Sequence, residues 1–342
     1  MAFRSSVGLF ALVPLLSACG VTERLLGGPD DPGPAAQVQV VETTPDGLTI
    51  LARSPEQALL LESVAFDSRG RLLVSSIHQA GVFRLDLDGS LTRLTREGDT
   101  QGVFGMISDR DRGHLWVTTA NTLYDQIEGE GGSALMRLDL GSGEIQAIYA
   151  LPEPGHQLSD LALGPDGTVF VSDTTGGGIY MLSPGSGRLE HLVDAPARAS
   201  PQGLVVSEDG RWLIFSNYGT GLHRVVISTG TMQAVRLPED RQIRGLDGLA
   251  LDGNRIIAIH NGSPPGRVLA LTLSPDWTEV RDMEMLFDGA PLSEPTTGFV
   301  SGDSFVFIAR SQWSDFGQDG APTSTTLAPA TVGRINLSES RP

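Results

Sequence analysis

A pattern of strand, tight turn and strand returns six times along this 342-residue chain. The copies are ESVAFDSRGRLLVSS from Glu62, FGMISDRDRGHLWVTT from Phe104, SDLALGPDGTVFVSD from Ser159, QGLVVSEDGRWLIFSN from Gln202, DGLALDGNRIIAIHN from Asp247 and TGFVSGDSFVFIARS from Thr297. Alternating apolar residues around Gly-containing turns are typical of β-hairpins. A third strand follows in most copies, as in GVFRLDL and RVLALTL.

The starts of the copies are 42, 55, 43, 45 and 50 residues apart. A period of this length with several strands per copy predicts an all-β fold, a six-bladed β-propeller. The segment DGLTILAR (Asp46–Arg53) precedes the first copy, whereas the sixth copy ends at VGRINL close to the end of the chain. We therefore predict that this N-terminal strand closes the last blade. A β-sandwich is the alternative, and six copies with matching turns disfavour it.

The N-terminal residues MAFRSSVGLFALVPLLSACG read as a secretory signal that ends at a lipobox, Leu16-Ser17-Ala18-Cys19. Cys19 is the only cysteine, and its lipidation would explain a lone thiol in an oxidising compartment. An ordinary signal peptide with a chance cysteine is the alternative. We expect a lipoprotein signal peptide at 1–19, a flexible tether at 20–36 and a single six-bladed propeller at 37–342.

The lipobox predicts a location in the bacterial cell envelope, with the membrane reached by the lipid anchor only. Gly20 follows the cysteine, whereas retention of Gram-negative lipoproteins at the inner membrane usually needs Asp there. In a Gram-negative host we therefore expect the periplasmic leaflet of the outer membrane.

Charge and composition exclude several functions. A net charge of -17 and a pI near 4.7 argue against a nucleic-acid partner. The chain has no lysine, which excludes Schiff-base chemistry and a Walker-type phosphate loop. It also has no GxSxG elbow, so an α/β-type serine hydrolase is excluded.

Propellers bind ligands where the ends of their inner strands converge on the axis. The residues that open the inner strands are expected to share one ring: Glu62, Phe104, Ser159, Gln202, Asp247 and Thr297. Loops above this ring carry the candidate substrate-binding residues His78, Asn121, Asn217, His260, Asn261, Arg310 and Trp313, together with Tyr124, Asp125, Asp173, Tyr218 and Gln312.

Glu62 and Asp247 carry the strongest chemical signal in the ring, with Asp160 and Gln202 nearby. Converging carboxylates repel each other unless a cation lies between them or one keeps a proton. Oxygen ligands of this kind suit calcium, magnesium or manganese. The alternative is that each carboxylate caps backbone NH groups or pairs with an arginine such as Arg244.

Two long loops are expected on the same face, at residues 119–133 and 311–331. Loops of this length are usually functional or disordered. In the second loop, Trp313 and Phe316 are predicted to form an apolar wall over the pocket. The alternative is a lid without a function.

The segments ESVAFD, PQGLVVSEDG, LDGLALDGNRIIAIHNG and EPTTGFVSGDSFVFIARSQW resemble the regucalcin and gluconolactonase group of six-bladed propellers (the senescence marker protein family). This group is related to paraoxonase-type lactonases and strictosidine-synthase-like proteins. The resemblance covers residues 40–337 and is closest to a secreted branch with DGL…IAI.NG and SQW signatures.

The resemblance implies a divalent cation at the axis, held by Glu62 and Asp247. Gln202 stands where the group has an asparagine, and Asp160 stands near a further asparagine used by some members. Asp247 would also be the general base. The expected cofactor is calcium, with magnesium, manganese or zinc as alternatives.

The function that follows is metal-dependent hydrolysis of lactones or related esters, in a monomer with a small-molecule substrate. The alternative is a non-catalytic propeller that binds a small molecule, glycan or protein partner through the same face.

Overall fold

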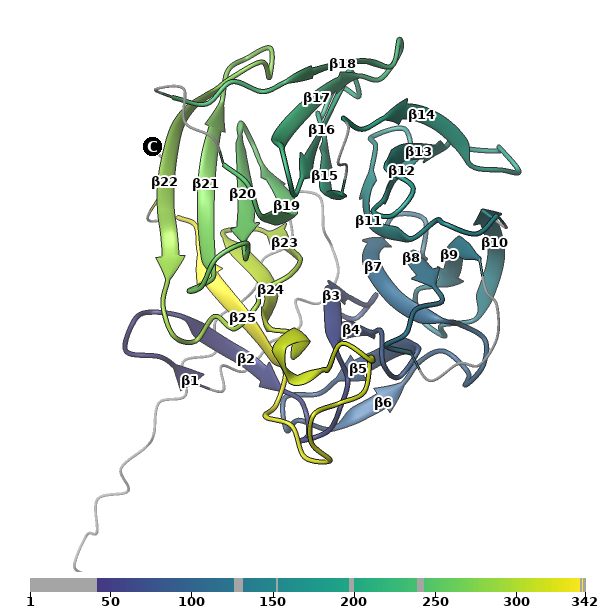
Figure 1. The fold of residues 1–342 in the computed structure, drawn as a ribbon, viewed down its shortest axis with the longest axis vertical. Helices are drawn as coiled ribbons and strands as arrows, with labels where there is room; N and C mark the ends of the chain where they lie inside the picture. Colours follow the sequence, from purple (N-terminus) through teal and green to yellow (C-terminus); the bar gives the residue numbers. More distant parts are fainter. Residues whose placement is uncertain are drawn as a thin grey trace, which may run out of the picture.

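The computed structural model of the protein describes residues 42–125, 132–151, 153–196, 200–238, 243–338 and 340. Six antiparallel sheets are arranged around a central axis (Figure 1). The predicted all-β fold, a six-bladed β-propeller, is confirmed. The signal peptide, Cys19 and the tether lie outside the described residues.

Blades one to five are four-stranded sheets whose strands follow each other in chain order from the axis outwards. Blade one contains β3 (Leu61–Phe66), β4 (Leu72–Ser76), β5 (Gly81–Leu85) and β6 (Leu91–Arg93). Blade two contains β7 (Gly102–Asp109), β8 (His114–Ala120), β9 (Ser133–Asp139) and β10 (Ile145–Leu151). Blade three contains β11 (Leu158–Leu163), β12 (Val169–Asp173), β13 (Gly178–Leu182) and β14 (Glu190–Asp194).

The next two blades repeat this order. Blade four contains β15 (Pro201–Val206), β16 (Trp212–Asn217), β17 (Gly221–Val226) and β18 (Thr231–Ala234). Blade five contains β19 (Leu246–Asp252), β20 (Arg255–His260), β21 (Arg267–Leu273) and β22 (Val280–Asp288).

Blade six joins the two ends of the described chain. Its strands are ordered β23 (Gly298–Ser301), β24 (Ser304–Arg310), β25 (Thr331–Asn336), β2 (Thr49–Arg53) and β1 (Glu42–Thr43). β2 pairs antiparallel with β25. The predicted closure by the N-terminal strand is therefore confirmed, and β1 extends the sheet by one strand that the sequence did not predict.

The hydrophobic core lies between neighbouring blades. Val64 and Val74 of blade one pack in one cluster with Val306 and Ile308 of blade six, and Leu51 of β2 belongs to the same cluster. All five are at most 2% exposed. Since each sheet has an apolar face that needs a partner, removal of one blade exposes two faces.

Helix is scarce in this fold. A short 3-10 helix, η2 (Trp313–Asp315), lies in the loop that follows β24. Within the described residues, no helix has the length and apolar character needed to cross a membrane.

Candidate active site at the propeller axis

A β-bulge near the start of the inner strand orients the site residues. In the first five blades, two residues of the inner strand lie opposite one residue of its neighbour at this point. The two residues within each bulge are Glu62-Ser63, Phe104-Gly105, Ser159-Asp160, Gln202-Gly203 and Asp247-Gly248. A bulge re-aims side chains, and here the first residue of each pair lines one cavity on the axis.

Hydroxyl groups on the second strands hold the bulges in place. Ser75 Oγ accepts a hydrogen bond from the NH of Ser63 at 2.8 Å and donates to the carbonyl of Phe104, in the next blade, at 2.7 Å. Ser216 Oγ similarly donates to the carbonyl of Asp247 at 2.9 Å. These bonds fix the residues that open neighbouring inner strands relative to one another.

Glycine at the second bulge position lets the inner strands approach closely. A Cβ on Gly203 would lie 2.4 Å from the backbone nitrogen of Leu249, and one on Gly248 would lie 2.6 Å from the carbonyl oxygen of Thr296. Real Cβ atoms do not come this close to backbone atoms. Asp160 occupies the same bulge position in blade three.

The axial pocket is a cavity of about 450 Å³ at the start of the inner strands. Its lining residues are Glu62, Phe104, Gln157, Ser159, Thr174, Gln202, Tyr218, Asp247, Asn261, Glu294 and Trp313. Five of the six predicted ring residues are among them. The sixth, Thr297, lines a different cavity and donates from its hydroxyl to the carbonyl of Glu62 at 3.0 Å.

Glu62 and Asp247 lie in the axial pocket, each with one neutral donor. The indole NH of Trp313 donates to Glu62 Oε2 at 2.9 Å, and the amide of Asn261 donates to Asp247 Oδ2 at 2.5 Å. Burial raises the pKa of Glu62 well above its usual value, and the charge of Asp247 raises it further. Burial and the charge of Asp160 likewise raise the pKa of Asp247. Within the part of the chain that the structure describes, no cationic residue lines the pocket to keep the two carboxylates ionised.

Asp160 adds a third acidic group close to this pair. Its residue is 8% exposed, and its Oδ2 atom is buried without a hydrogen-bond partner among the described residues. Burial raises the pKa of Asp160 to about 7. Asp160 also lines a second cavity, whose other walls come from later residues of the inner strands.

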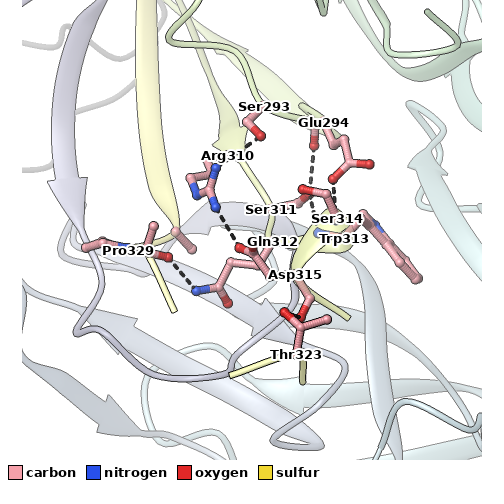
Figure 2. A network of polar contacts seen from close by, with 12 residues as sticks. Ser293, Glu294, Arg310, Ser311, Gln312, Trp313, Ser314, Asp315, Thr323 and Pro329 are labelled. Atoms are coloured by element: carbon pink, nitrogen blue, oxygen red, sulfur yellow. Dashed lines mark hydrogen bonds and ion pairs between the residues drawn. The ribbon is translucent and has the colours of Figure 1, made fainter. Parts of the chain in front are cut away.

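The SQW segment after β24 places Trp313 in the lining of the axial pocket, and Figure 2 shows the polar contacts that hold this segment. Gln312 is 1% exposed; its amide oxygen accepts from the NH groups of Leu59 and Leu60, and its amide nitrogen donates to the carbonyls of Gln57 and Ala328. This clamp fixes the neighbouring Trp313, which reaches the pocket.

The predicted aromatic wall is divided between two places. Trp313 lines the axial pocket beside Phe104 and meets Tyr124 edge-on, with ring centroids 5.0 Å apart. Phe316 is 9% exposed and packs behind them against His78. Of the two predicted wall residues, Trp313 alone lines the axial pocket, where it is joined by the aromatic rings of Phe104 and Tyr218.

Glu294 is a pocket residue that sequence reasoning missed. Its Oε2 accepts from the backbone NH of Ser314 at 2.5 Å, and its carbonyl accepts from the hydroxyl of Ser311 at 2.7 Å (Figure 2). Its φ of 51° is in the left-handed region, an unusual conformation for a residue with a side chain. An acidic residue directly before Pro295 and the last inner strand was the available signal.

Asn261 and Trp313 are the candidate substrate-binding residues that line the axial pocket. The other five, which do not line it, are His78, Asn121, Asn217, His260 and Arg310. Local contacts occupy some of them: His78 Nδ1 bonds to the carbonyl of Tyr124 at 2.7 Å, and Arg310 pairs with Asp315 at 2.6 Å.

Among the described residues, no group of three His, Cys, Asp or Glu side chains is placed to hold a metal ion by itself. A cation in the axial pocket would take two carboxylates and complete its shell with neutral oxygens. Gln202 donates from its amide nitrogen to Ser200 Oγ at 3.0 Å, which leaves the amide oxygen available. Carboxylate and amide oxygens suit calcium, so the residues present fit the predicted ion.

No protein-family model and no curated protein matches this sequence. Solved structures match at the level of the fold. A gluconolactonase from Xanthomonas campestris is 14% identical, with 85% of this chain and 89% of that chain covered and a TM-score of 0.57. The PQQ-bound aldose sugar dehydrogenase of Streptomyces coelicolor is 15% identical, with 84% and 98% covered and a TM-score of 0.57.

A luciferin-regenerating enzyme is 14% identical, with 82% of this chain and 92% of that chain covered and a TM-score of 0.55. Identities this low show a shared propeller fold. The group that the sequence resembles has this fold, and the structural likeness includes one of its gluconolactonases.

Proposed function

We propose that the protein hydrolyses lactones or related esters with the help of a divalent cation bound in the axial pocket. The observation that carries the proposal is the pair Glu62 and Asp247, two carboxylates in one pocket whose pKa values are raised by burial and by neighbouring acidic groups. None of the described lining residues of this pocket is cationic. A bound cation would reduce the electrostatic repulsion between these two carboxylates.

Glu62, Asp247 and the amide oxygen of Gln202 would hold the ion. When bound, a divalent cation supplies Lewis-acid polarisation of an ester carbonyl. Asp160 adds negative charge nearby and so favours a cation over an anion in the pocket.

Asp247 is positioned to act as the general base. Asn261 donates to Asp247 Oδ2 and to the carbonyl of Pro295, and its own oxygen accepts from the hydroxyl of Tyr218 at 2.9 Å. These three bonds orient the amide and, through it, the carboxylate. Asp247 then takes the proton of a water whose oxygen adds to the ester carbonyl.

The same lining argues against an anionic cofactor. PQQ is a polycarboxylate, and the axial pocket presents Glu62, Asp247 and Glu294 with no described cationic residue. The described residues therefore do not fit PQQ, although an enzyme with a similar fold was solved in its PQQ-bound form.

A binding function without catalysis is the second candidate. It is favoured by Phe104, which puts an aromatic ring into the site, and by Gln202, whose longer side chain replaces the asparagine of the resembled group. In this reading the pocket holds a neutral ligand between Phe104 and Trp313.

Calcium-dependent stability tests the metal site. Calcium at a hundredfold excess over its Kd should stabilise the wild type by about 2.7 kcal/mol. Asp247→Asn should lose this gain, whereas Glu190→Gln, which removes an exposed carboxylate on β14, should keep it. A wild-type melting curve that ignores calcium, magnesium, manganese and zinc would overturn the metal site.

Hydrolysis of a panel of lactones and aryl esters tests the activity. We expect calcium-dependent turnover that Asp247→Asn lowers by at least about a hundredfold, as expected for loss of a general base. Calcium binding without turnover of any member would favour the binding function.

We also propose that Cys19 anchors the protein in the cell envelope through lipid. Cys19→Ser should prevent lipid attachment and shift the chain from the membrane to the soluble or unprocessed fraction. Unchanged processing and membrane fractionation of this variant would contradict the proposal.

A further inference from the structure

A second cavity, which we call the far cavity, lies on the axis beyond the bulges. It has a volume of about 240 Å³, roughly eight times the ~30 Å³ that one water molecule occupies in the liquid. Its walls come from the later residues of the inner strands, including Ile107, Leu163, Leu251 and Val300. These four side chains are partly exposed, so the far cavity has an apolar wall that water reaches.

Asp160 is the carboxyl group in this apolar lining. Its Oδ2 has no hydrogen-bond partner among the described residues. The corresponding bulge positions of blades four and five offer no polar side chain, because Gly203 and Gly248 occupy them. Ser63 also lines the far cavity, but its hydroxyl already contacts the backbone of Met106.

The positive charges at the far end of the strands are engaged elsewhere. In the turns that end the inner strands, Arg71 pairs with Asp67 at 2.7 Å and Arg255 pairs with Asp252 at 2.6 Å. Neither arginine is part of the lining of the far cavity. An unpaired buried carboxyl is costly, and a ligand that brings its own positive charge would remove this cost.

We propose that the far cavity binds a primary alkylammonium ion of about six carbons, with the ammonium group on Asp160 and the hydrocarbon chain along Leu163, Leu251 and Val300. The walls of hydrocarbon offer a chain its hydrophobic contact. A metal ion would find few further oxygens there, and a neutral alkane or alcohol would leave the carboxylate unpaired. This site is separate from the proposed ester hydrolysis in the axial pocket.

Titration calorimetry of the full chain with hexylammonium, hexanol, hexanoate and calcium tests the proposal. Hexylammonium should bind about tenfold or more tightly than hexanol, because a charged hydrogen bond contributes that much. Hexanoate should not bind. Asp160→Asn should reduce the affinity for hexylammonium to that for hexanol.

Two variants separate the far cavity from the axial pocket. Asp247→Asn should change the hexylammonium affinity much less than Asp160→Asn does, because it removes only a neighbouring charge and not the carboxylate that contacts the ammonium group. Leu251→Trp should fill the far cavity and abolish hexylammonium binding with Asp160 still present, in a protein whose circular dichroism and melting curve show the native fold.

Three results would overturn the proposal. Equal affinity of the wild type for hexylammonium and hexanol would mean that Asp160 recognises no cation. Loss of hexylammonium binding in Asp247→Asn but not in Asp160→Asn would place the ion in the axial pocket. Calcium binding that displaces hexylammonium and disappears in Asp160→Asn would make the far cavity a metal site.

Discussion

The inner strands build a polar pocket at their beginning and an apolar cavity further along. At the axial pocket, the first bulge residues Glu62, Gln202 and Asp247 meet polar side chains from the loops. In the far cavity, the same strands contribute glycines and aliphatic residues, with Asp160 as the acidic exception. The bulge separates the two cavities within two consecutive residues: its first residue lines the axial pocket, and in blades one, three, four and five its second residue lines the far cavity.

The connecting segments differ in the same way. The far end has tight turns in which an acidic residue is paired locally, as in Asp109 with Arg112 and Asp209 with Arg211. The pocket end carries the SQW segment and Glu294, and within the described residues the side-chain donors to Glu62 and Asp247 are the neutral groups of Trp313 and Asn261. The acidic residues of the tight turns are therefore paired with arginines, whereas those of the axial pocket, where a ligand can enter, are not.

Among the tests of this difference in charge between the two ends, the pH dependence of stability should give the largest effect. Burial raises the pKa of Asp160 to about 7, about three units above its value in the unfolded chain, which corresponds to at most about 4 kcal/mol. The unfolded state releases this proton first, so the free energy of unfolding should fall as the pH rises from about 4 to about 7 and then level off. Urea denaturation with a chelator present measures the change.

Asp160→Asn should remove the share of that fall that Asp160 contributes, so that the variant is more stable than the wild type at pH 8 and similar to it at pH 4, whereas the share of Glu62 and Asp247 remains. Asp209→Asn, in an exposed turn, should not change the slope. If the free energy of unfolding of the wild type instead rises between pH 4 and 7, the three carboxyl groups are not buried in the way that we infer.

A test of strand packing is expected to have the next largest effect. Gly203→Ala places a Cβ against the backbone of Leu249, which cannot move without separating blades four and five. We expect a loss of about 2–3 kcal/mol in the free energy of unfolding. Gly187→Ala is the control, because its Cβ would meet nothing within 4 Å. Equal urea midpoints for the two variants would show that the inner strands have room for a methyl group.

The blades and the ring positions were predictable because they repeat. In five of the six copies the bulge comes at the same place near the start of the inner strand, so Glu62, Gln202 and Asp247 could be assigned to the axis from spacing alone. The closing strand β2 followed from a spare apolar segment. The two-residue strand β1 had no such pattern and was missed.

The loop residues were not predictable because their contacts are not periodic. Gln312 and His78 carry polar groups that serve neighbouring backbone atoms, and the sequence does not distinguish this use from ligand binding. Glu294 lines the pocket with its backbone in a left-handed conformation, which the local sequence pattern does not predict. Asp160 was expected near Glu62; its charge does raise the pKa of Glu62, and the residue also lines the far cavity, which the sequence did not predict.

Loss of the hydrogen bonds of Gln312 should affect ligand binding in the axial pocket but not in the far cavity. Gln312→Ala removes the acceptor for the NH groups of Leu59 and Leu60 and leaves them buried, at a cost of about 2 kcal/mol. Trp313 should lose its fixed position, so ligand binding in the axial pocket should weaken. Binding in the far cavity should stay as it is, and a parallel loss at both ends would contradict the separation of the two cavities.

The smallest effect is expected for Trp313→Phe, which keeps an aromatic ring beside Phe104 and removes the NH that Glu62 accepts. That hydrogen bond lowers the pKa of Glu62, so its loss should raise the pKa further. In the absence of a divalent cation the unfolding free energy should fall by about 1 kcal/mol at pH 8, because the higher pH favours ionisation of Glu62. At pH 4 the loss should be smaller, because Glu62 keeps its proton. Calcium should restore part of the loss, because the ion replaces the missing donor. If the variant loses the same stability at both pH values, the indole contributes packing alone, and Glu62 does not depend on Trp313 for its charge.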